Sequence, residues 1–323
     1  MAEKIILIGF GGTIVSTHTE QGVRPGLSLE SLLADHEESH AKRAEVVCEE
    51  LLVIDSSKIL AEHLLLLAKT VDAHLQDPEV LGIVITHGTD TLEESAYFLM
   101  RTLAAKKPVC FTAAQRTASE ANPDGPVNLA HALHFVSEPA AANFGVCISM
   151  NGKFYSVQGL QKIHTSALDA FANQDNEKTA FAQISDGQLH VHYTPKNPAP
   201  LALETLQLPL PRVDIIYDFP GSDAALIRAS IDAGSQGLVI QAMGAGNVSG
   251  STAIAIEDAL KKGLTIMIAT RVPFGKLHPK YGGVGGGHTL LEAGCLFPDE
   301  TLPASQARIE LQLLLARNQN ISR

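Results

Sequence analysis

The stretch LGIVITHGTDTLEESAYFL, residues 81–99, has the pattern of a strand followed directly by a helix. Its first five residues are apolar, as in a strand that is buried on both faces. Apolar residues then recur at helical spacing, at Leu92, Ala96, Leu99 and Leu103. Thr91 and Glu94 fit a capping box, which predicts the start of the helix. The junction contains Thr89 and Asp90, and ligands of open parallel sheets bind at such strand ends.

The same alternation of apolar runs and helical patterns fills residues 1–190. It predicts strands at residues 4–8, 50–54, 81–85, 109–112 and 145–150, and helices at residues 59–74, 92–103 and 127–136. Strands and helices that alternate form βαβ units with a parallel sheet. Residues 191–212 interrupt the pattern with five prolines and are the expected linker between two domains.

Alternation resumes over residues 213–323. It predicts strands at residues 213–217, 237–242 and 264–269, and helices at residues 223–233, 252–262 and 304–317. A chain of 323 residues is long enough for two hydrophobic cores. We therefore predict two α/β domains with mainly parallel sheets flanked by helices, a larger N-terminal domain and a smaller C-terminal domain.

The composition excludes several classes of partner. Asp and Glu outnumber Lys and Arg by 35 to 24, and a net charge of -11 would repel a phosphate backbone, so we expect no nucleic-acid partner. No apolar stretch approaches the roughly 20 residues that cross a bilayer, so we expect no membrane partner. The opening residues MAEKIILIGF lack the pattern of a signal peptide, which favours the cytoplasm. Four cysteines lack CxxC spacing and are expected to be reduced: Cys48, Cys110, Cys147 and Cys295.

A glycine turn, GFGGTIVST at residues 9–17, follows the first expected strand. Adjacent glycines allow a sharp turn and a close approach of the backbone. A dinucleotide fingerprint would need a glycine in place of Ile14, and a P-loop would need a Gly-Lys-Ser/Thr sequence, so nucleotide binding is disfavoured. Ile14 and Val15 are β-branched, so we expect the chain to leave the turn extended. Thr13 then lies at the same sheet edge as Thr89, although a threonine in a turn often only satisfies local backbone.

Three segments make the interpretation more specific. They are GGTI at residues 11–14, ITHGTDTLEESAYFL at residues 85–99 and DGPVNL at residues 124–129. In sequence, order and separation they resemble the bacterial-type L-asparaginase and glutaminase-asparaginase family. The resemblance extends over essentially the whole chain and includes the two-domain layout. The segment VIDSSK at residues 53–58 is similar to the cytoplasmic branch of that family.

The resemblance implies four catalytic residues. Thr13 corresponds to the family's nucleophile, and Thr89 and Asp90 to its second threonine and its aspartate. Lys162, in the segment GLQKIHTSALDAF at residues 159–171, corresponds to its lysine. A threonine hydroxyl needs a base or a proton relay to attack an amide carbon, and Thr89 and Lys162 are suited to that task.

The resemblance also implies how a substrate is held. Ser56 would bind the α-carboxylate of an amino acid and Asp90 its α-ammonium group, with Ser57 beside them. Backbone N–H groups near Gly12 and Thr89 are candidate donors to the oxyanion of a tetrahedral intermediate.

The protonation state of Lys162 stays open at the level of the sequence. The neighbours Leu160 and Ile163 are apolar, and burial would favour the neutral amine that a relay needs. A nearby Asp90 carboxylate would instead favour the charged ammonium, which would act electrostatically.

The sequence also departs from the family pattern. The family's mobile loop usually carries a tyrosine, and Val23 stands there in EQGVRPG, residues 20–26. The family's periplasmic branch supplies a glutamate from a neighbouring subunit, and residues 269–283 contain none. Asn247, in a GAGN turn that resembles the intersubunit contact loop, is a candidate for binding the substrate's ammonium group.

Other clusters are expected to be structural. His190 and His192 share a face of a probable strand, and His131 and His134 share a face of a helix, but neither pair has the further ligands of a metal site. The run GGVGGG at residues 282–287 resembles a flexible loop.

The expected function is hydrolysis of the side-chain amide of L-asparagine to L-aspartate and ammonia, with glutamine as a possible minor substrate. The resemblance implies no metal or organic cofactor and a homodimer or homotetramer. Two other hypotheses are a catalytically weak amino-acid-binding or regulatory protein of the same family, and the amidotransferase subunit that feeds ammonia to glutamyl-tRNA. The latter is disfavoured because its extra N-terminal domain has no room before GGTI.

Overall fold

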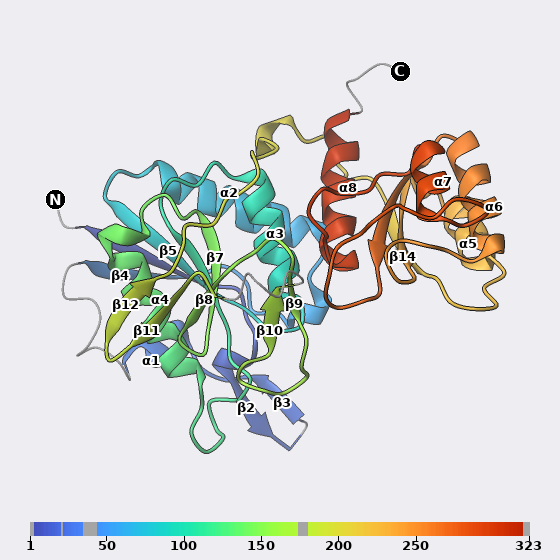
Figure 1. Cartoon of the computed structure of the whole chain (residues 1–323). Helices are drawn as coiled ribbons and strands as arrows, with labels where there is room; N and C mark the ends of the chain where they lie inside the picture. The colour runs from blue at the N-terminus through green and yellow to red at the C-terminus, as the bar shows by residue number, and fades with distance from the viewer. Residues whose placement is uncertain (1–2, 21, 35–43, 174–179, 319–323) are drawn as a thin grey trace. The chain divides into compact units, whose positions relative to one another are not determined.

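A computed structural model describes residues 3–20, 22–34, 44–173 and 180–318 of the chain. These residues form two compact units: the second contains residues 158–161, 173 and 204–318, and the first contains the others. Each unit is a sheet flanked by helices, which confirms the predicted two-domain α/β class (Figure 1). None of the described helices is long and apolar enough to cross a membrane.

An eight-stranded sheet forms the centre of the first unit, in the order β12-β11-β8-β7-β6-β5-β1-β4. Its parallel part consists of β4 (Glu45–Glu50), β1 (Lys4–Gly9), β5 (Val80–Thr86), β6 (Val109–Thr112) and β7 (Val146–Met150). Three antiparallel strands extend it: β8 (Lys153–Ser156), β11 (Ala182–Ser185) and β12 (Gln188–Val191). Of these three, only the region of β12 was suggested by the sequence pattern.

Helices cover both faces of this sheet. On one face, α1 (Leu29–Ala34) and α4 (Gly125–Ser137) pack on a core that includes Leu7 and Val84. The other face is covered by α2 (Ala61–Gln76) and α3 (Leu92–Thr102). Because β5 is buried on both faces, its sequence is a nearly continuous apolar run.

The prediction of a strand at residues 50–54 is wrong, because the strand β4 ends at Glu50. β4 is an edge strand with alternating exposed and half-buried residues, so its sequence EVVCEE has only a weak apolar signal. The more apolar residues after it leave the ladder. The N–H groups of Leu51 and Leu52 both donate to the carbonyl of Gly9, at 3.1 Å.

Short elements lie beside the parallel strands. The chain turns through a 3-10 turn, η1 (Thr13–Val15), into a hairpin of β2 (Ser16–Thr19) and β3 (Gly22–Pro25). A second 3-10 turn, η2 (Ser56–Lys58), precedes α2. Further along the chain, β9 (Leu160–Lys162) pairs with β10 (Phe171–Asn173).

The second unit has a three-stranded parallel sheet of β13 (Val213–Tyr217), β14 (Gly237–Ala242) and β15 (Thr265–Thr270). On one face, α5 (Ala225–Asp232) and α6 (Gly250–Lys261) contribute to the core. On the other face, α8 (Ala304–Asn318) packs on all three strands. A short helix, α7 (Gly287–Glu292), begins at the last glycine of the glycine run.

Two glycines bring the ends of β1 and β5 into direct backbone contact. Gly12 has a φ of 95°, and a Cβ atom added there would lie 2.3 Å from the carbonyl oxygen of His87 and 2.4 Å from the nitrogen of Gly88. A Cβ on Gly88 would lie 3.4 Å from the Cα of Gly12. Only glycine at position 12 lets the two chain segments touch.

We predict that Gly12→Ala destabilises the protein by about 3 kcal/mol or more, because the added methyl group must push two strand ends apart. Urea unfolding followed by circular dichroism measures the loss. Gly187→Ala is the matched control, because Gly187 has a φ of 72° but no atoms within 4 Å of the added Cβ. Backbone strain alone should cost it about 1–2 kcal/mol. Equal losses in the two variants would contradict the close contact.

Candidate active site

Thr13 lies one residue beyond the glycine contact, at the carboxyl end of β1. It begins the 3-10 turn η1 and is partly exposed, whereas Ile14 and Val15 are buried. The prediction that the chain is extended directly after the glycines is therefore wrong. A 3-10 turn comes first, and the chain becomes extended only at β2. The Oγ of Ser16 donates to the carbonyl of Gly12 at 2.9 Å, which ties the turn to the start of the hairpin.

Thr89 and Asp90 lie one and two residues beyond the same contact, on the β5 side. Thr89 is buried, at 6% exposure, while the side chain of Asp90 is 67% exposed. Because Gly12 and Gly88 touch, the residues that follow them, Thr13 and Thr89, start from adjacent points of the backbone. The structure thus brings the two predicted threonines to one place on the sheet edge.

Lys162 joins this place from β9, more than seventy residues further along the chain. Its Nζ donates to Thr89 Oγ1 at 2.8 Å and to Asp90 Oδ1 at 2.8 Å. The Lys162 side chain is only 17% exposed. Its bond to Thr89 is partly buried, whereas its bond to Asp90 lies at the exposed surface. Leu160 is buried as expected, but Ile163 is 48% exposed and does not enclose the lysine.

Ser56 reaches the same turn from η2. Its side chain is buried and its Oγ would lie 2.5 Å from a Cβ on Gly88, which shows how closely it approaches the β5 end. Thr91 Oγ1 donates to the carbonyl of Ser56 at 2.9 Å. The expected capping box is therefore wrong: Thr91 is the N-cap residue of α3, but its hydroxyl makes no cap hydrogen bond and instead holds η2. Ser57 is exposed beside Ser56.

His87 stabilises the backbone at Gly88, where β5 ends, a role that the sequence did not suggest. The ring is fully buried between Phe10 and Phe111. Since a carbonyl only accepts, Nδ1 donates to the Gly88 carbonyl at 2.7 Å, and Nε2 then accepts from Ser95 Oγ at 2.8 Å. Burial lowers the pKa of His87 to about 4, so the imidazole is neutral near pH 7 and has no free nitrogen for proton transfer.

The DGPVNL segment also has a structural role. Asp124 accepts hydrogen bonds from the backbone N–H groups of Gln115 and Arg116, at 3.0 and 2.8 Å. Asn128, one turn into α4, donates to the Ala113 carbonyl and to Asp124. These bonds shape the loop that follows β6, at the same edge of the sheet. The motif recognised in the sequence thus fixes backbone geometry.

The loop that follows β6 holds the β2–β3 hairpin, where the family's tyrosine would lie. The N–H of Ala118 donates to the Ser16 carbonyl, and the N–H of His18 donates to Ser119 Oγ, each at 2.9 Å. The side chain of Val23 lies outside the described part of the structure.

Asn247 belongs to the second unit, where its Oδ1 accepts from the N–H of Gly287 at 3.1 Å. The glycine run expected to be a loop packs tightly there. A Cβ on Gly285 would lie 2.2 Å from the carbonyl oxygen of Val248. Asn247 therefore holds the start of α7.

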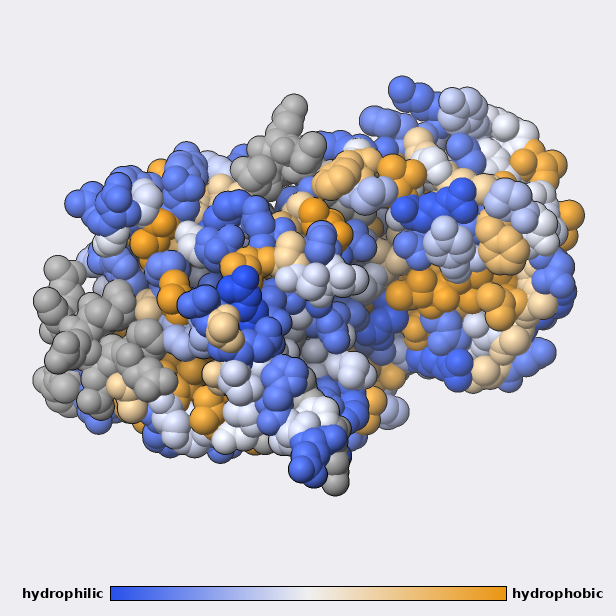
Figure 2. All heavy atoms as spheres, turned by 90° about the horizontal axis from the view of Figure 1, so that it is seen from below, coloured by the Kyte–Doolittle hydropathy of each residue, from blue (hydrophilic) through white to orange (hydrophobic). Residues whose placement is uncertain are grey.

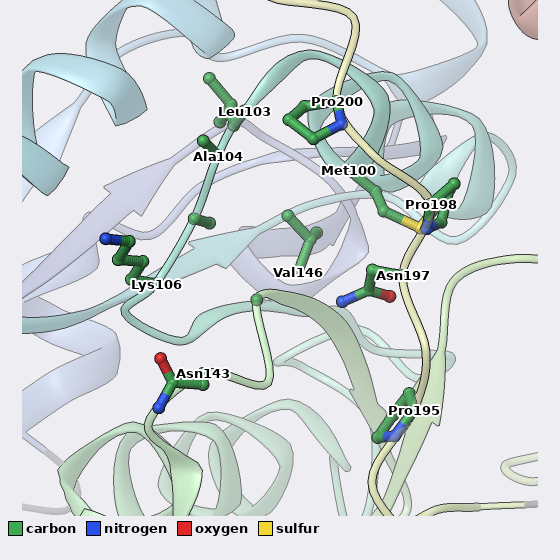
Figure 3. Close-up of a pocket in the computed structure, with 12 residues that line it drawn as sticks. Met100, Leu103, Ala104, Lys106, Asn143, Val146, Pro195, Asn197, Pro198 and Pro200 are labelled. Carbon is green, nitrogen blue, oxygen red and sulfur yellow. The ribbon is translucent and has the colours of Figure 1, made fainter.

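A cavity of about 360 Å³ lies elsewhere in the first unit (Figure 3). It is lined by residues 103–106 together with the proline-rich segment around Asn197. Among the described residues that line the cavity, Lys106 is the one ionisable side chain. None of the predicted site residues lines this cavity. This cavity therefore lacks a nucleophile paired with an acid or base. Across the described ranges, no three His, Cys, Asp or Glu side chains are grouped to hold a metal ion.

Comparison with known proteins gives relatives over nearly the whole chain. An L-asparaginase of Bacillus licheniformis is 30% identical over 98% of this chain and 96% of its own length. A probable periplasmic L-asparaginase of Haemophilus influenzae is 30% identical over 98% of this chain and 90% of its own. The crystal structure of a probable cytoplasmic L-asparaginase from Campylobacter jejuni superposes with a TM-score of 0.83 and 30% identity, over 97% of this chain and 95% of that one.

Family models match both units of the chain. The asparaginase N-terminal domain matches residues 4–197, and the glutaminase/asparaginase C-terminal domain matches residues 212–323. Together with the relatives, these matches agree with the glycine turn, the strand-end threonines and the two-domain α/β fold. The chain therefore belongs to the asparaginase family of hydrolases.

Proposed function

We propose that this protein hydrolyses the side-chain amide of L-asparagine through a threonyl ester on Thr13. The single observation that best supports this function is the arrangement of Lys162, whose Nζ donates at 2.8 Å to both Thr89 and Asp90 next to the glycine turn that presents Thr13. The names of the relatives, which are L-asparaginases from several bacteria, support the choice of substrate.

The proposed reaction has two steps. The Thr13 hydroxyl attacks the amide carbon, the C–N bond breaks, and the hydroxyl proton leaves with the nitrogen as ammonia. Water then attacks the ester, which releases L-aspartate and restores the Thr13 hydroxyl. Because Lys162 Nζ donates to Thr89 Oγ1, the hydrogen of the Thr89 hydroxyl is available to another acceptor, and Thr89 can carry the proton between Thr13 and the leaving nitrogen.

Lys162 has an electrostatic role in this mechanism. Its Nζ is 2.8 Å from a carboxylate oxygen of Asp90, which is the geometry of an ion pair. Of the two roles that the sequence left open, we therefore propose the charged lysine, which polarises the Thr89 hydroxyl by hydrogen bonding. The backbone N–H groups near Gly12 and Thr89 would stabilise the oxyanion.

We assign substrate recognition to the polar groups around Lys162, Thr89 and Asp90. Ser56, held in place by Thr91, would bind the α-carboxylate, with exposed Ser57 beside it. Asp90, whose side chain is 67% exposed, is free to bind the α-ammonium group with the carboxylate oxygen that Lys162 does not use. We propose that the reaction takes place in the cytoplasm, because the Campylobacter relative is named a probable cytoplasmic L-asparaginase.

Thr13→Ala should lower kcat for ammonia release by at least about 10⁴-fold, because the nucleophile is lost. Thr89→Val, which keeps the shape but removes the hydroxyl, should lower kcat by about 10²- to 10⁴-fold. Ammonia release from L-asparagine measures both, and the exposed Thr194→Ala serves as the control that should keep full activity. Near-normal turnover by Thr13→Ala would refute the proposed nucleophile, and an inactive wild type would favour a binding or regulatory protein.

Asp90→Asn should raise KM for L-asparagine by about 10-fold or more, because a charge-assisted hydrogen bond to the α-ammonium group is lost. The matched substrate is the analogue that lacks the α-amino group. Its KM should change by less than about threefold, since Asp90 has no ammonium to bind there. Both substrates should show the same fall in kcat from the weakened Lys162 ion pair. Equal KM changes for the two substrates would show that Asp90 does not recognise the α-ammonium.

We further propose that the protein is a homodimer or homotetramer. Large apolar side chains on the second unit are exposed, and Figure 2 shows apolar surface there. Those at least 40% exposed are Leu208, Tyr217, Phe219, Leu226, Ile254, Phe274, Tyr281, Val284 and Leu291. Exposed apolar surface of this kind is typical of interfaces between subunits. Sedimentation velocity should give the mass of a dimer or tetramer, and a monomer at micromolar concentration would contradict the assignment.

A further inference from the structure

Gln306 is a fully buried polar side chain that the proposed reaction does not use. It lies in the first turn of α8. Glutamine side chains are mostly exposed in proteins, and a buried amide needs hydrogen-bond partners for its oxygen and its nitrogen. In this structure, those partners are main-chain groups of the segment that leads to Lys162.

Gln306 binds two successive residues of that segment. Its Oε1 accepts from the N–H of Gly159 at 2.9 Å, and its Nε2 donates to the carbonyl of Leu160 at 3.1 Å. Both hydrogen bonds are buried, and all three residues belong to the second unit. One side chain thus satisfies a main-chain donor and a main-chain acceptor, which fixes both the position and the direction of the chain there.

A second buried amide, that of Asn173, holds the residue before this pair. Its Nδ2 donates to the carbonyl of Gln158 at 2.7 Å. Gly159 has a φ of 77°, and a Cβ atom added there would lie 2.9 Å from Asn173 Oδ1. Side-chain amides therefore hold the main chain at three successive residues, from Gln158 to Leu160.

The strand β9 begins at Leu160 and ends at Lys162. It has three residues and pairs with β10, which is equally short, and a two-stranded sheet is hardly stable without further contacts. Residues two apart in a strand direct their side chains to the same face. A rotation or shift of the main chain at Leu160 would therefore also move the Lys162 side chain, whose Nζ donates to Thr89 at 2.8 Å.

We propose that Gln306 is a positioning residue for Lys162: by fixing the main chain at Gly159 and Leu160, its amide determines where β9 presents the lysine ammonium to Thr89. This inference rests on the proposed function of Lys162 and Thr89. A main-chain shift of about 1 Å would lengthen the hydrogen bond to Thr89 and weaken the polarisation of its hydroxyl.

The same helix provides a matched control residue. Gln312 of α8 is also buried, and its Nε2 donates to the carbonyl of Pro211 at 2.9 Å. Gln312 therefore makes the same kind of buried bond to main chain, but to a residue outside β9. Its loss should lower stability without moving Lys162.

Gln306→Met keeps an unbranched side chain of similar length and removes both hydrogen bonds. It should lower kcat for ammonia release from L-asparagine by about 10- to 100-fold, while KM changes by less than about threefold. Gln312→Met should keep kcat within about twofold of the wild type. Both variants should lose a few degrees of Tm, so the assays are run well below either Tm. Equal kcat values in the two variants would overturn the positioning role.

Gln306→Glu tests the same bonds if Gln306→Met does not fold. A protonated carboxyl can accept from the Gly159 N–H and donate to the Leu160 carbonyl, whereas an ionised one has no donor. Burial raises the pKa of a carboxyl, so the variant should keep most of the wild-type kcat at about pH 5. The ratio of its kcat to that of the wild type should fall by about 10-fold or more by about pH 9. A ratio that stays constant, in protein shown to be folded by circular dichroism, would contradict the inference.

A double variant tests whether Gln306 acts through Lys162. If it does, adding Gln306→Met to Lys162→Met should change kcat by less than about twofold. A further loss of about 10-fold or more would show that Gln306 acts by another route, and the inference would fail.

The single variant Lys162→Met separates this inference from the proposed function. If Lys162→Met loses activity but Gln306→Met has the same kcat as Gln312→Met, only the role of Gln306 is refuted. If Lys162→Met is fully active, the proposed relay and the inference fail together.

Discussion

The backbone contact between Gly12 and the His87–Gly88 peptide is the constraint on which the rest of the site depends. It joins the ends of β1 and β5 so closely that a Cβ on Gly12 would lie 2.3 Å from a carbonyl oxygen. Each chain segment then continues directly into a threonine, Thr13 on one side and Thr89 on the other. The fold thus brings the backbone of two threonines from distant parts of the chain together at the sheet edge.

Around this contact, buried side chains stabilise the backbone, and polar side chains at the surface are available for catalysis and substrate binding. His87, neutral and buried, fixes the Gly88 carbonyl from below. Lys162 donates to both Thr89 and Asp90. In the mechanism that we propose, activation of the Thr13 hydroxyl depends on Lys162 and Thr89.

The sequence predicted the features that are local. The apolar run and helical pattern at residues 81–103 match β5 and α3 within a few residues, because both elements are buried and long enough to show their periodicity. The edge strand β4 was misplaced because edge strands have a weak apolar signal. Thr91 was predicted to cap its own helix, but it bonds to Ser56, thirty-five residues away in the chain. The role of His87 depends on packing against Phe10 and Phe111, which are distant in the chain, and no local pattern reveals it.

The central claim is that Thr13 carries the acyl group during turnover. It is tested most directly by mixing the enzyme with L-asparagine, quenching with acid within the first turnover, and mapping the modified peptide by mass spectrometry. The account predicts a mass increase of one aspartyl group, located on Thr13. An aspartyl adduct on any other residue would contradict it, as would ammonia release in the first turnover with no covalent adduct on the quenched protein.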